Sequence, residues 1–577
     1  MRHDDLVFDV GMHLGEDTAF YLAKGYRVVG FEADPGLATR CRARFDEPLR
    51  QGRLEIVEGA IAPAERGPRV PFYASSLSVW GTVEPQWAAR NDRLGARSRR
   101  LDVPRVDLAA VFAARGTPHY LKIDIEGMDR HVLETLVALD ERPRHVSIES
   151  DKVRFDALTA ELALLRSLGY DRFKVVQQRD IPGASIRTLD LLGRPLRFTF
   201  PKHSSGPFGD DILQPWIDHD AALARYREVF DDYARFGDDA LAAARQAREP
   251  VPRKTAGWYD THARLADAAE PPAPTVSIVV TCKDRLDHLR QTLPSLAAQP
   301  DAQVIVVDYG CTQDTRGWVR RHCPSVTVVC ADDDPVFSVS RARNVGALHA
   351  RGEHLVFTDA DIHVDFAIAD WLRRHRSDGE FYTVEPARSA SLSGTAIIGR
   401  LAFLAAGGYD EALRGWGWED TELYRRLERR GLRRVEISGH GLHAIEHGDD
   451  QRQLSADRGG AGSRAQALLL GGLYTRARHD IAQLGHREPS HGERVALHAR
   501  IRAAVDAFMA SPASEGHFRL RIDLAPGRDQ VTGTELLYRF RRPVVEAGGD
   551  PGSAPRVDGS VPGDAGLAPG GTGRTVD

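Results

Sequence analysis

The chain contains few cysteines and no long apolar segment. Only five of its 577 residues are cysteine, and none forms a CxxC pair, so neither a disulfide framework nor a zinc site is indicated. The apolar runs are short enough to be strands, and no apolar segment of signal-peptide length follows the first residues. These absences predict a cytoplasmic protein without a transmembrane segment.

The chain also lacks an excess of charge of either sign. Its 77 lysines and arginines and its 82 aspartates and glutamates give a net charge of −5, and the arginines are scattered among acidic residues. Such a surface does not attract nucleic acid, which is therefore not an expected partner. With 42% hydrophobic and 28% charged residues, a chain of this length is expected to form two or more globular domains.

Strand-sized apolar runs alternate with helix-length segments in two parts of the chain. The first part begins with residues 6–10 and 27–32, and the second with residues 276–282 and 303–310. This alternation predicts two α/β domains, each built on a mostly parallel sheet. Residues 264–274 are rich in alanine and proline, as is typical of a linker.

The remainder of the chain divides by composition. Residues from about 455 to 509 show a polar, helix-like pattern, whereas the last residues are mainly Gly, Pro, Ala and Asp. We predict a first domain over 1–262, a linker over 263–274, a second domain over 275–452, a helical C-terminal extension over 453–545 and a disordered tail over 546–577.

Two glycines, Gly11 and Gly15, follow the first strand and precede a helix. Glycine lets the backbone pass close to a ligand, and a helix N-terminus offers unpaired N–H groups. Glu32 ends the next strand, where a carboxylate can accept hydrogen bonds from ribose hydroxyls, and Ala60 lies where a third strand ends, near the expected adenine. The GxxxG spacing favours S-adenosylmethionine over NAD. A tight connection without a ligand is the alternative.

Charged residues also surround the end of a fourth strand, in the segment LKIDIEG over 121–127. Open α/β sheets bind ligands at this edge. Asp124 is the leading candidate to contact an oxygen nucleophile and take its proton, with Glu126 and His13 behind it. The alternative for Asp124 is a carboxylate that only fixes the loop.

The run FDVGMHLGEDTAFYLAKGYRVVGFEADP, with LKIDIEGMDRHVLETL and HVSIES, resembles the FkbM family of methyltransferases over residues 1 to about 262. The resemblance implies a class I, Rossmann-like methyltransferase domain that uses S-adenosylmethionine, in a family that often methylates sugar hydroxyls. It also implies that Asp9, Gly11, Gly15 and Glu32 hold the cofactor and that Asp124 lies near the transferred methyl group.

In the second part, Asp359 and Asp361 follow an apolar strand and are separated by one residue. In a turn, both carboxylates can reach Mg²⁺ or Mn²⁺ and its diphosphate, although a DxD sequence alone is more often a solvated turn. About 55 residues downstream, the segment GWGWEDTEL contains Trp416, Trp418 and Glu419, followed by Asp420. Tryptophans suit the apolar faces of sugar rings, and adjacent acids supply a base and hydrogen-bond acceptors.

Residues 275–450 resemble GT-A glycosyltransferases of the family 2 type, and GWGWEDTEL is similar to the C-terminal domain of β-1,4-galactosyltransferases and chondroitin-synthase-like enzymes. The resemblance implies a nucleotide-sugar donor, UDP-linked, a glycan acceptor, Mn²⁺ or Mg²⁺, and single displacement with inversion. It assigns roles to the following residues: Asp308 to the uridine, Arg341 and Asn344 to the donor pocket, Asp359 and Asp361 to metal and diphosphate, His447 to the metal, and Asp420 as the base. His443, Asp449 and Asp450 compete with His447.

The combined prediction is a bifunctional enzyme that adds a sugar and methylates a hydroxyl on the same or a related glycan. Fusion would raise the local concentration of an intermediate for the second site. In an alternative reading, the methyltransferase-like domain acts on a non-sugar hydroxyl or serves only as a binding scaffold beside an active glycosyltransferase.

Overall fold

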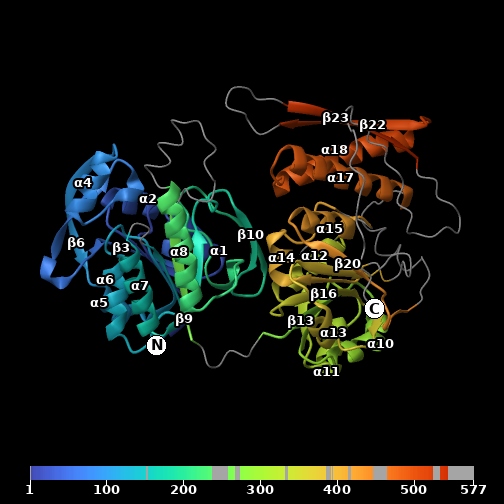
Figure 1. Ribbon diagram of the computed structural model, residues 1–577, viewed down its shortest axis with the longest axis horizontal. Coiled ribbons are helices and arrows are strands. Elements are labelled where there is room, and N and C mark those ends of the chain that lie inside the picture. Colours follow the sequence, from blue (N-terminus) through green and yellow to red (C-terminus); the bar gives the residue numbers. More distant parts are fainter. Residues whose placement is uncertain are drawn as a thin grey trace. The chain divides into compact units, whose positions relative to one another are not determined.

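The computed structural model describes residues 2–150, 154–236, 258–266, 273–331, 336–384, 392, 394–413, 417–445, 464–523 and 533–542. The chain divides into two compact units, Met1–Pro271 and Pro272–Asp577, which are considered separately (Figure 1). The predicted sites at Trp416, His447, Asp449 and Asp450, and the predicted tail, lie outside the described residues. Within those ranges, no helix is long and apolar enough to cross a membrane.

The first unit is built on a seven-stranded sheet with the strand order β3-β2-β1-β7-β8-β12-β9. The strands are β1 (Arg2–Val10), β2 (Arg27–Glu32), β3 (Leu54–Glu58), β7 (Thr117–Ile123), β8 (His145–Glu149), β9 (Tyr170–Gln177) and β12 (Tyr259–Leu265). The five strands from β3 to β8 are parallel, and β12 is antiparallel to both of its neighbours. The predicted mostly parallel α/β sheet is confirmed.

Helices cover this sheet, and two smaller sheets lie beside it. The helices are α1 (Glu16–Ala23), α2 (Pro35–Arg44), α3 (Asp46–Arg50), α4 (Pro85–Arg93), α5 (Leu108–Arg115), α6 (Asp129–Thr135), α7 (Phe155–Ser167) and α8 (His219–Phe236). The smaller sheets contain β4 (Ala60–Ile61), β5 (Arg69–Ser75) and β6 (Ser98–Val106), and β10 (Ser185–Leu189) with β11 (Pro195–Thr199). Apolar side chains form a core on each face of the large sheet; Phe8 belongs to one core and Val7 to the other.

The second unit contains a seven-stranded sheet in the order β15-β14-β13-β16-β19-β18-β20 and a β17-β21 pair. The strands are β13 (Val276–Cys282), β14 (Ala302–Asp308), β15 (Thr327–Cys330), β16 (His354–Asp359), β17 (Ile362–Val364), β18 (Glu380–Val384), β19 (Ala396–Gly399), β20 (Arg433–Ile437) and β21 (Leu442–Ala444). Every residue of β13 is buried, as expected for a central parallel strand with a continuous apolar sequence.

The helices that pack on this sheet are α10 (Leu286–Ala297), α11 (Thr315–His322), α12 (Val339–Leu348), α13 (Ile368–His375), α14 (Arg400–Ala405) and α15 (Glu419–Arg429). The C-terminal extension adds α17 (Arg464–Leu484), α18 (His491–Ala510) and the hairpin strands β22 (Glu515–Asp523) and β23 (Gly533–Arg541). Its apolar core also includes Ala412 and Leu413, so the extension packs on the loop before α15 (Figure 1).

Two predictions about the domain organisation need correction: the start of the linker and the helical content of the C-terminal extension. Strand β12 continues to Leu265, three residues into the predicted linker, because its backbone pairs with β8 and β9 along this length. The extension is not wholly helical: β22 and β23 pair antiparallel, with Phe518 and Leu520 facing its core and Arg519 exposed between them. A buried-exposed alternation of period two is typical of a strand.

Candidate active sites

A cavity in the first unit lies at the carboxyl ends of β1, β2 and β7. Strands β2 and β3 lie on one side of β1, and β7 and β8 lie on its other side, so the strand order reverses at β1. Open α/β sheets usually bind their ligands at such a point. Its lining includes Gly11, His13, Glu32, Ala60, Asp124 and Glu126. Most of the predicted residues of this site are therefore brought together, whereas Asp9 and Gly15 lie outside the lining.

Two backbone N–H groups fix the carboxylate of Glu32. The N–H of His13 donates to one carboxylate oxygen at 2.9 Å, and the N–H of Asp34 donates to the other at 2.8 Å. The side chain is buried, and this burial raises the pKa of Glu32 to about 7. The arrangement presents a fixed acceptor to the cavity, as recognition of hydroxyl groups requires.

The two glycines of the first loop are required by close contacts within the protein. At Gly11, φ is +83°, and a Cβ atom would lie 1.9 Å from the carbonyl oxygen of Asp124. At Gly15, φ is +75°, and a Cβ atom would lie 2.3 Å from the ring of Phe45. Gly11 thus lets the ends of β1 and β7 approach each other beneath the cavity, and Gly15 fits against an aromatic ring.

We expect Gly11→Ala to destabilise the first unit by about 2 kcal/mol more than Gly52→Ala, since it adds overpacking against backbone. Gly52 has a similar φ of +68°, but a Cβ atom there would have no neighbour within 4 Å, so Gly52→Ala isolates the cost of the left-handed backbone. Thermal unfolding of both variants measures the difference. Equal losses of stability would contradict the role assigned to the Gly11 contact.

Lys122, which sequence reasoning did not single out, lines the cavity and contacts three carboxylates. Its Nζ is 3.4 Å from Asp9 Oδ1, 3.5 Å from Asp17 Oδ2 and 3.4 Å from Asp124 Oδ2. Asp9 is fully buried and also accepts a hydrogen bond from Thr18 Oγ1 at 2.6 Å. Asp9 therefore helps to position Lys122. The available signal in the sequence was a lysine near the end of a buried strand, next to Asp124.

Asp124 is the most accessible acid of this group, with 41% of its side chain exposed. Ser205 Oγ lies 3.4 Å from its Oδ2 and is held in place because the Ser205 N–H donates to Asp17 at 3.0 Å. His13 instead contacts Glu16 at 3.0 Å through Nδ1 and Ser78 Oγ at 2.8 Å through Nε2. Asp124 is consequently better placed than His13 to meet an incoming hydroxyl.

In the second unit, Arg343 on α12 joins the acids of two distant motifs. Its Nη1 donates to Asp420 Oδ1 at 2.8 Å, and its Nη2 lies 3.4 Å from Asp359 Oδ1. Glu419 Oε1 is 3.8 Å from Nη1, and the Arg343 side chain is only 2% exposed. The DxD and WED segments, which the sequence placed in one site, therefore meet around one buried cation.

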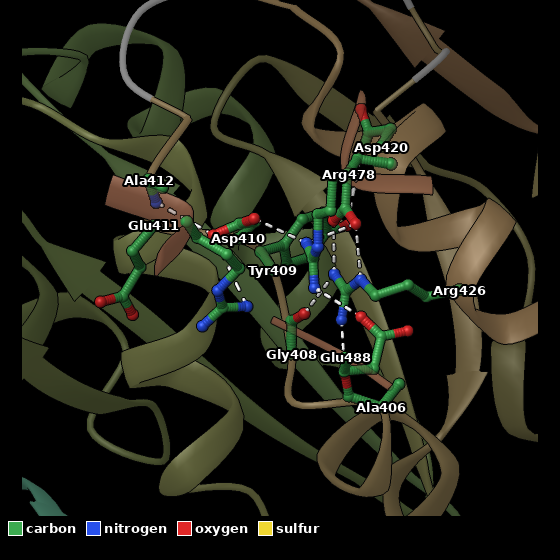
Figure 2. A network of polar contacts seen from close by, with 12 residues as sticks. Ala406, Gly408, Tyr409, Asp410, Glu411, Ala412, Asp420, Arg426, Arg478 and Glu488 are labelled. Atoms are coloured by element: carbon green, nitrogen blue, oxygen red, sulfur yellow. Dashed lines mark hydrogen bonds and ion pairs between the residues drawn. The ribbon is translucent and has the colours of Figure 1, made fainter. Parts of the chain in front are cut away.

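Burial affects the protonation of these acids. It raises the pKa of Asp420 and raises that of Glu419 to about 7, although the Arg343 charge opposes both shifts. Tyr409 Oη also donates to Asp420 Oδ1 at 3.1 Å, and Figure 2 shows Asp420 at the edge of a larger polar network that contains Tyr409. A carboxylate with a raised pKa is suited to accept a proton near neutral pH.

The predicted donor residues have different surroundings. Asn344 uses both ends of its amide on the Tyr409 backbone: Oδ1 accepts from the N–H at 2.8 Å, and Nδ2 donates to the carbonyl at 2.9 Å. Arg341 Nη1 lies 3.7 Å from Glu411. Both residues therefore hold the loop that carries Tyr409. Asp308 is buried at the end of β14, where it accepts hydrogen bonds from Arg316 Nε at 2.6 Å and the Cys311 N–H at 2.8 Å.

The predicted metal site is described only in part. Asp359 has 42% of its side chain exposed, and the Asp361 carbonyl accepts a hydrogen bond from the Ile445 N–H at 2.8 Å. Ile445 precedes His447 by two residues in the sequence, and two carboxylates with a histidine fit Mn²⁺ or Mg²⁺. No group of three metal-binding side chains occurs among the described residues. His443 Nε2 instead contacts Asp365 at 2.8 Å.

Fold and sites together define a transferase with two α/β domains, and comparison with known proteins identifies both. Residues 9–172 match the family model for the methyltransferase FkbM domain. Residues 277–383 match glycosyl transferase family 2, and residues 381–448 match the model described as the N-terminal domain of galactosyltransferase. The resemblances inferred from the motifs are confirmed: the chain carries an FkbM-type methyltransferase domain and a family 2, GT-A-like glycosyltransferase domain.

No curated protein matches the chain. Among solved structures, the mannosyltransferase PcManGT from Pyrobaculum calidifontis in complex with GDP-Man and Mn²⁺ is 17% identical, with a TM-score of 0.29 over 51% of this chain and 87% of that one. S. aureus TarS 1–349 is 15% identical, with a TM-score of 0.26 over 41% and 75%. The catalytic domain of Drosophila beta1,4galactosyltransferase 7 with xylobiose is 18% identical, with a TM-score of 0.24 over 31% and 73%. Similarities at this level carry no information about substrates.

Proposed function

We propose that the chain is a bifunctional glycan-modifying enzyme. The first unit transfers a methyl group from S-adenosylmethionine to a sugar hydroxyl, and the second transfers a sugar from a UDP-linked donor to a glycan acceptor. The observation that carries the proposal is the meeting of Asp359, Glu419 and Asp420 around Arg343, within the residues that match the glycosyl transferase family 2 and galactosyltransferase models. The cysteines are free thiols, which fits the cytoplasmic compartment expected from the sequence.

For methyl transfer, the cavity at the end of β1 offers complementary groups. S-adenosylmethionine, when bound, supplies a methyl group already activated by a sulfonium. Glu32 would accept hydrogen bonds from the ribose and Ala60 would lie by the adenine, while Gly11 lines the cavity and lets the ends of β1 and β7 approach each other. Asp124 would orient the acceptor hydroxyl and take its proton, while Lys122 holds the carboxylate in place.

For glycosyl transfer, Asp420 takes the proton of the acceptor hydroxyl while that oxygen attacks the anomeric carbon opposite the leaving nucleotide, which inverts the configuration. Asp359, Asp361 and His447 would hold Mn²⁺ or Mg²⁺, which stabilises charge on a leaving diphosphate. Asp308 would contact the uridine. Glu419 and Trp416 would contact the acceptor. Trp418, also expected to contact a sugar ring, instead packs its indole against Gly471 and Gly472 of α17.

Glu32→Gln should weaken S-adenosylmethionine binding by about 30-fold, about 2 kcal/mol, because an amide replaces a charged acceptor. Its NH₂ group would also face one of the two backbone N–H donors. Glu58→Gln is the matched control, since Glu58 ends β3 directly beside Glu32 but does not line the cavity. Calorimetric titration measures both affinities. Wild-type affinity should also fall as pH drops through about 7, where Glu32 becomes protonated.

Asp361→Asn should raise the Mn²⁺ concentration needed for half-maximal sugar transfer by about tenfold or more, which corresponds to about 1.4 kcal/mol of metal binding. The substitution removes one anionic oxygen but keeps the side-chain size. A panel of UDP-sugars with Mn²⁺ titration supplies the measurement, and Asp370→Asn, on the exposed side of α13, is the control. If transfer is independent of metal in the wild type, the metal-dependent part of the proposal is wrong.

A further inference from the structure

Trp418 immediately precedes α15 and has a left-handed backbone, with φ of +75°. A bulky residue adopts this strained conformation only where surrounding contacts hold it there. The next two residues are Glu419 and Asp420, the first two residues of the helix. Whatever holds Trp418 therefore also sets the direction in which these two acids enter the site.

Two adjacent glycines of α17 make that contact. A Cβ atom on Gly471 would lie 2.6 Å from Trp418 Cδ1, and one on Gly472 would lie 3.0 Å from Trp418 Cζ2. Both glycines are buried within a helix of 21 residues, where glycine is less favourable than alanine. The helix loses stability at these positions, and the missing side chains leave a slot for both rings of the indole.

The same helix supports Asp420 by a second route. Tyr474 Oη and Arg478 Nη1, both on α17, each donate to Asp410 at 2.6 Å. Figure 2 shows Arg478 between Asp410 and the residues around Arg426. Asp410 follows Tyr409, whose hydroxyl donates to Asp420. Helix α17 thus contacts Trp418, two residues before the acid proposed as the base, and the loop whose tyrosine donates a hydrogen bond to that acid.

We propose that α17 is a part of the glycosyltransferase site and that Gly471 and Gly472 are positioning residues for sugar transfer. They act through Trp418, whose seated indole fixes the first turn of α15. Residues 464–484 lie beyond the galactosyltransferase match at 381–448, so the working domain extends past the boundary predicted at residue 452. This inference rests on the proposed sugar transfer. It adds that the transfer requires the C-terminal extension, which contains α17.

The test uses alanine substitutions in the full-length protein. Gly471→Ala should lower the kcat of sugar transfer by about tenfold or more, because a small misplacement of a catalytic group has a large effect on rate. Gly472→Ala, with the looser contact, should have a smaller effect and serves as the milder variant if Gly471→Ala folds poorly. The donor KM should not change. Gly492→Ala, exposed on α18 with nothing within 4 Å of its Cβ, should keep the wild-type kcat.

If Gly471 and Gly472 only shaped the helix, alanine at these positions should stabilise α17 and leave the kcat of sugar transfer unchanged. Acrylamide quenching of Trp418, taken as the difference between each protein and its Trp418→Phe counterpart, reports the contact without any turnover. We expect greater quenching in Gly471→Ala. A wild-type kcat in that variant, or unchanged quenching, would overturn the proposal. Absence of transfer by the wild-type chain would instead overturn the proposed function, while quenching would still report whether α17 seats the indole.

Discussion

Asp420→Asn is expected to reduce sugar transfer by about 10²–10⁴-fold, the range in which general-base catalysis contributes. Asparagine keeps the size of the side chain and an oxygen that can accept the hydrogen bond from Arg343, now 2.8 Å from Asp420. It cannot take a proton from the acceptor hydroxyl. The fold should therefore be preserved while kcat falls, and initial-rate measurements with the active UDP-sugar check this.

Two further variants make the result specific. Asp370→Asn removes an exposed carboxylate from α13 and should leave kcat unchanged. Glu419→Gln tests the neighbouring acid, since burial raises the pKa of Glu419 to about 7 and makes it a competing base. If Glu419→Gln abolishes transfer and Asp420→Asn leaves kcat within about threefold of wild type, the base is Glu419.

The strands that carry both sites could be predicted from the sequence because they are buried on both faces. Such strands contain continuous apolar runs with a polar residue at or next to the carboxyl end, as at Asp308 and Asp9. Parallel strands end at a common edge, so residues that follow them were expected to meet there. The carboxylates at Glu32 and Asp124 do line one cavity.

The cations that organise these carboxylates could not be chosen from the sequence. Arg341 and Arg343 both lie in the segment SRARNVGA, two residues apart on α12 and hence on different sides of the helix. Which arginine faces the acids depends on how the helix is rotated against the sheet, and this is set by packing with residues far away in sequence. Lys122 is visible among the charged residues of LKIDIEG, but the sequence does not show which carboxylates it contacts, because Asp9 and Asp17 lie far from it in the chain.

Two features of the C-terminal extension do not follow from the helical pattern of residues 455–509. Residues 515–523 alternate polar and apolar side chains, which is typical of a strand, although they fall within the extension predicted to be helical. The Gly471–Gly472 pair lies in the middle of a helix, where glycine is ordinarily only unfavourable. Its value depends on the indole of Trp418, which approaches from more than 50 residues earlier in the chain, and no local pattern records such a contact.

Arg478→Met is expected to destabilise the second unit by about 3–5 kcal/mol, the usual cost of removing one partner from a buried ion pair. The Arg478 side chain is 2% exposed and contacts Asp410 at 2.6 Å and Glu422. Asp410 is fully buried. Burial by itself would raise the pKa of Asp410, but Arg478 and Arg494 together hold it well below its ordinary value. Without Arg478, much of this compensation is lost and a buried negative charge remains.

The sign of the pH dependence follows from this shift. In the wild type, the lowered pKa of Asp410 contributes stability that is present above its unfolded pKa and lost as pH falls through the folded value. In Arg478→Met, burial raises that pKa, so the carboxyl protonates more readily and the loss of stability should be largest near neutral pH and smaller in acid. Arg476→Met is the matched control, because Arg476 lies on the same helix with 44% of its side chain exposed. It should cost about 1 kcal/mol or less.

Denaturant unfolding of the full chain measures these differences, and the two units are expected to give separate transitions. The transition that moves in Gly11→Ala belongs to the first unit, so the other reports the effect of Arg478→Met. Equal shifts for Arg478→Met and Arg476→Met would show that the buried pair adds no stability to the extension. A loss of stability in Arg478→Met that is large and grows from acid toward neutral pH would instead show that the ion pair between Asp410 and Arg478 stabilises the contact between α17 and the loop that carries Tyr409.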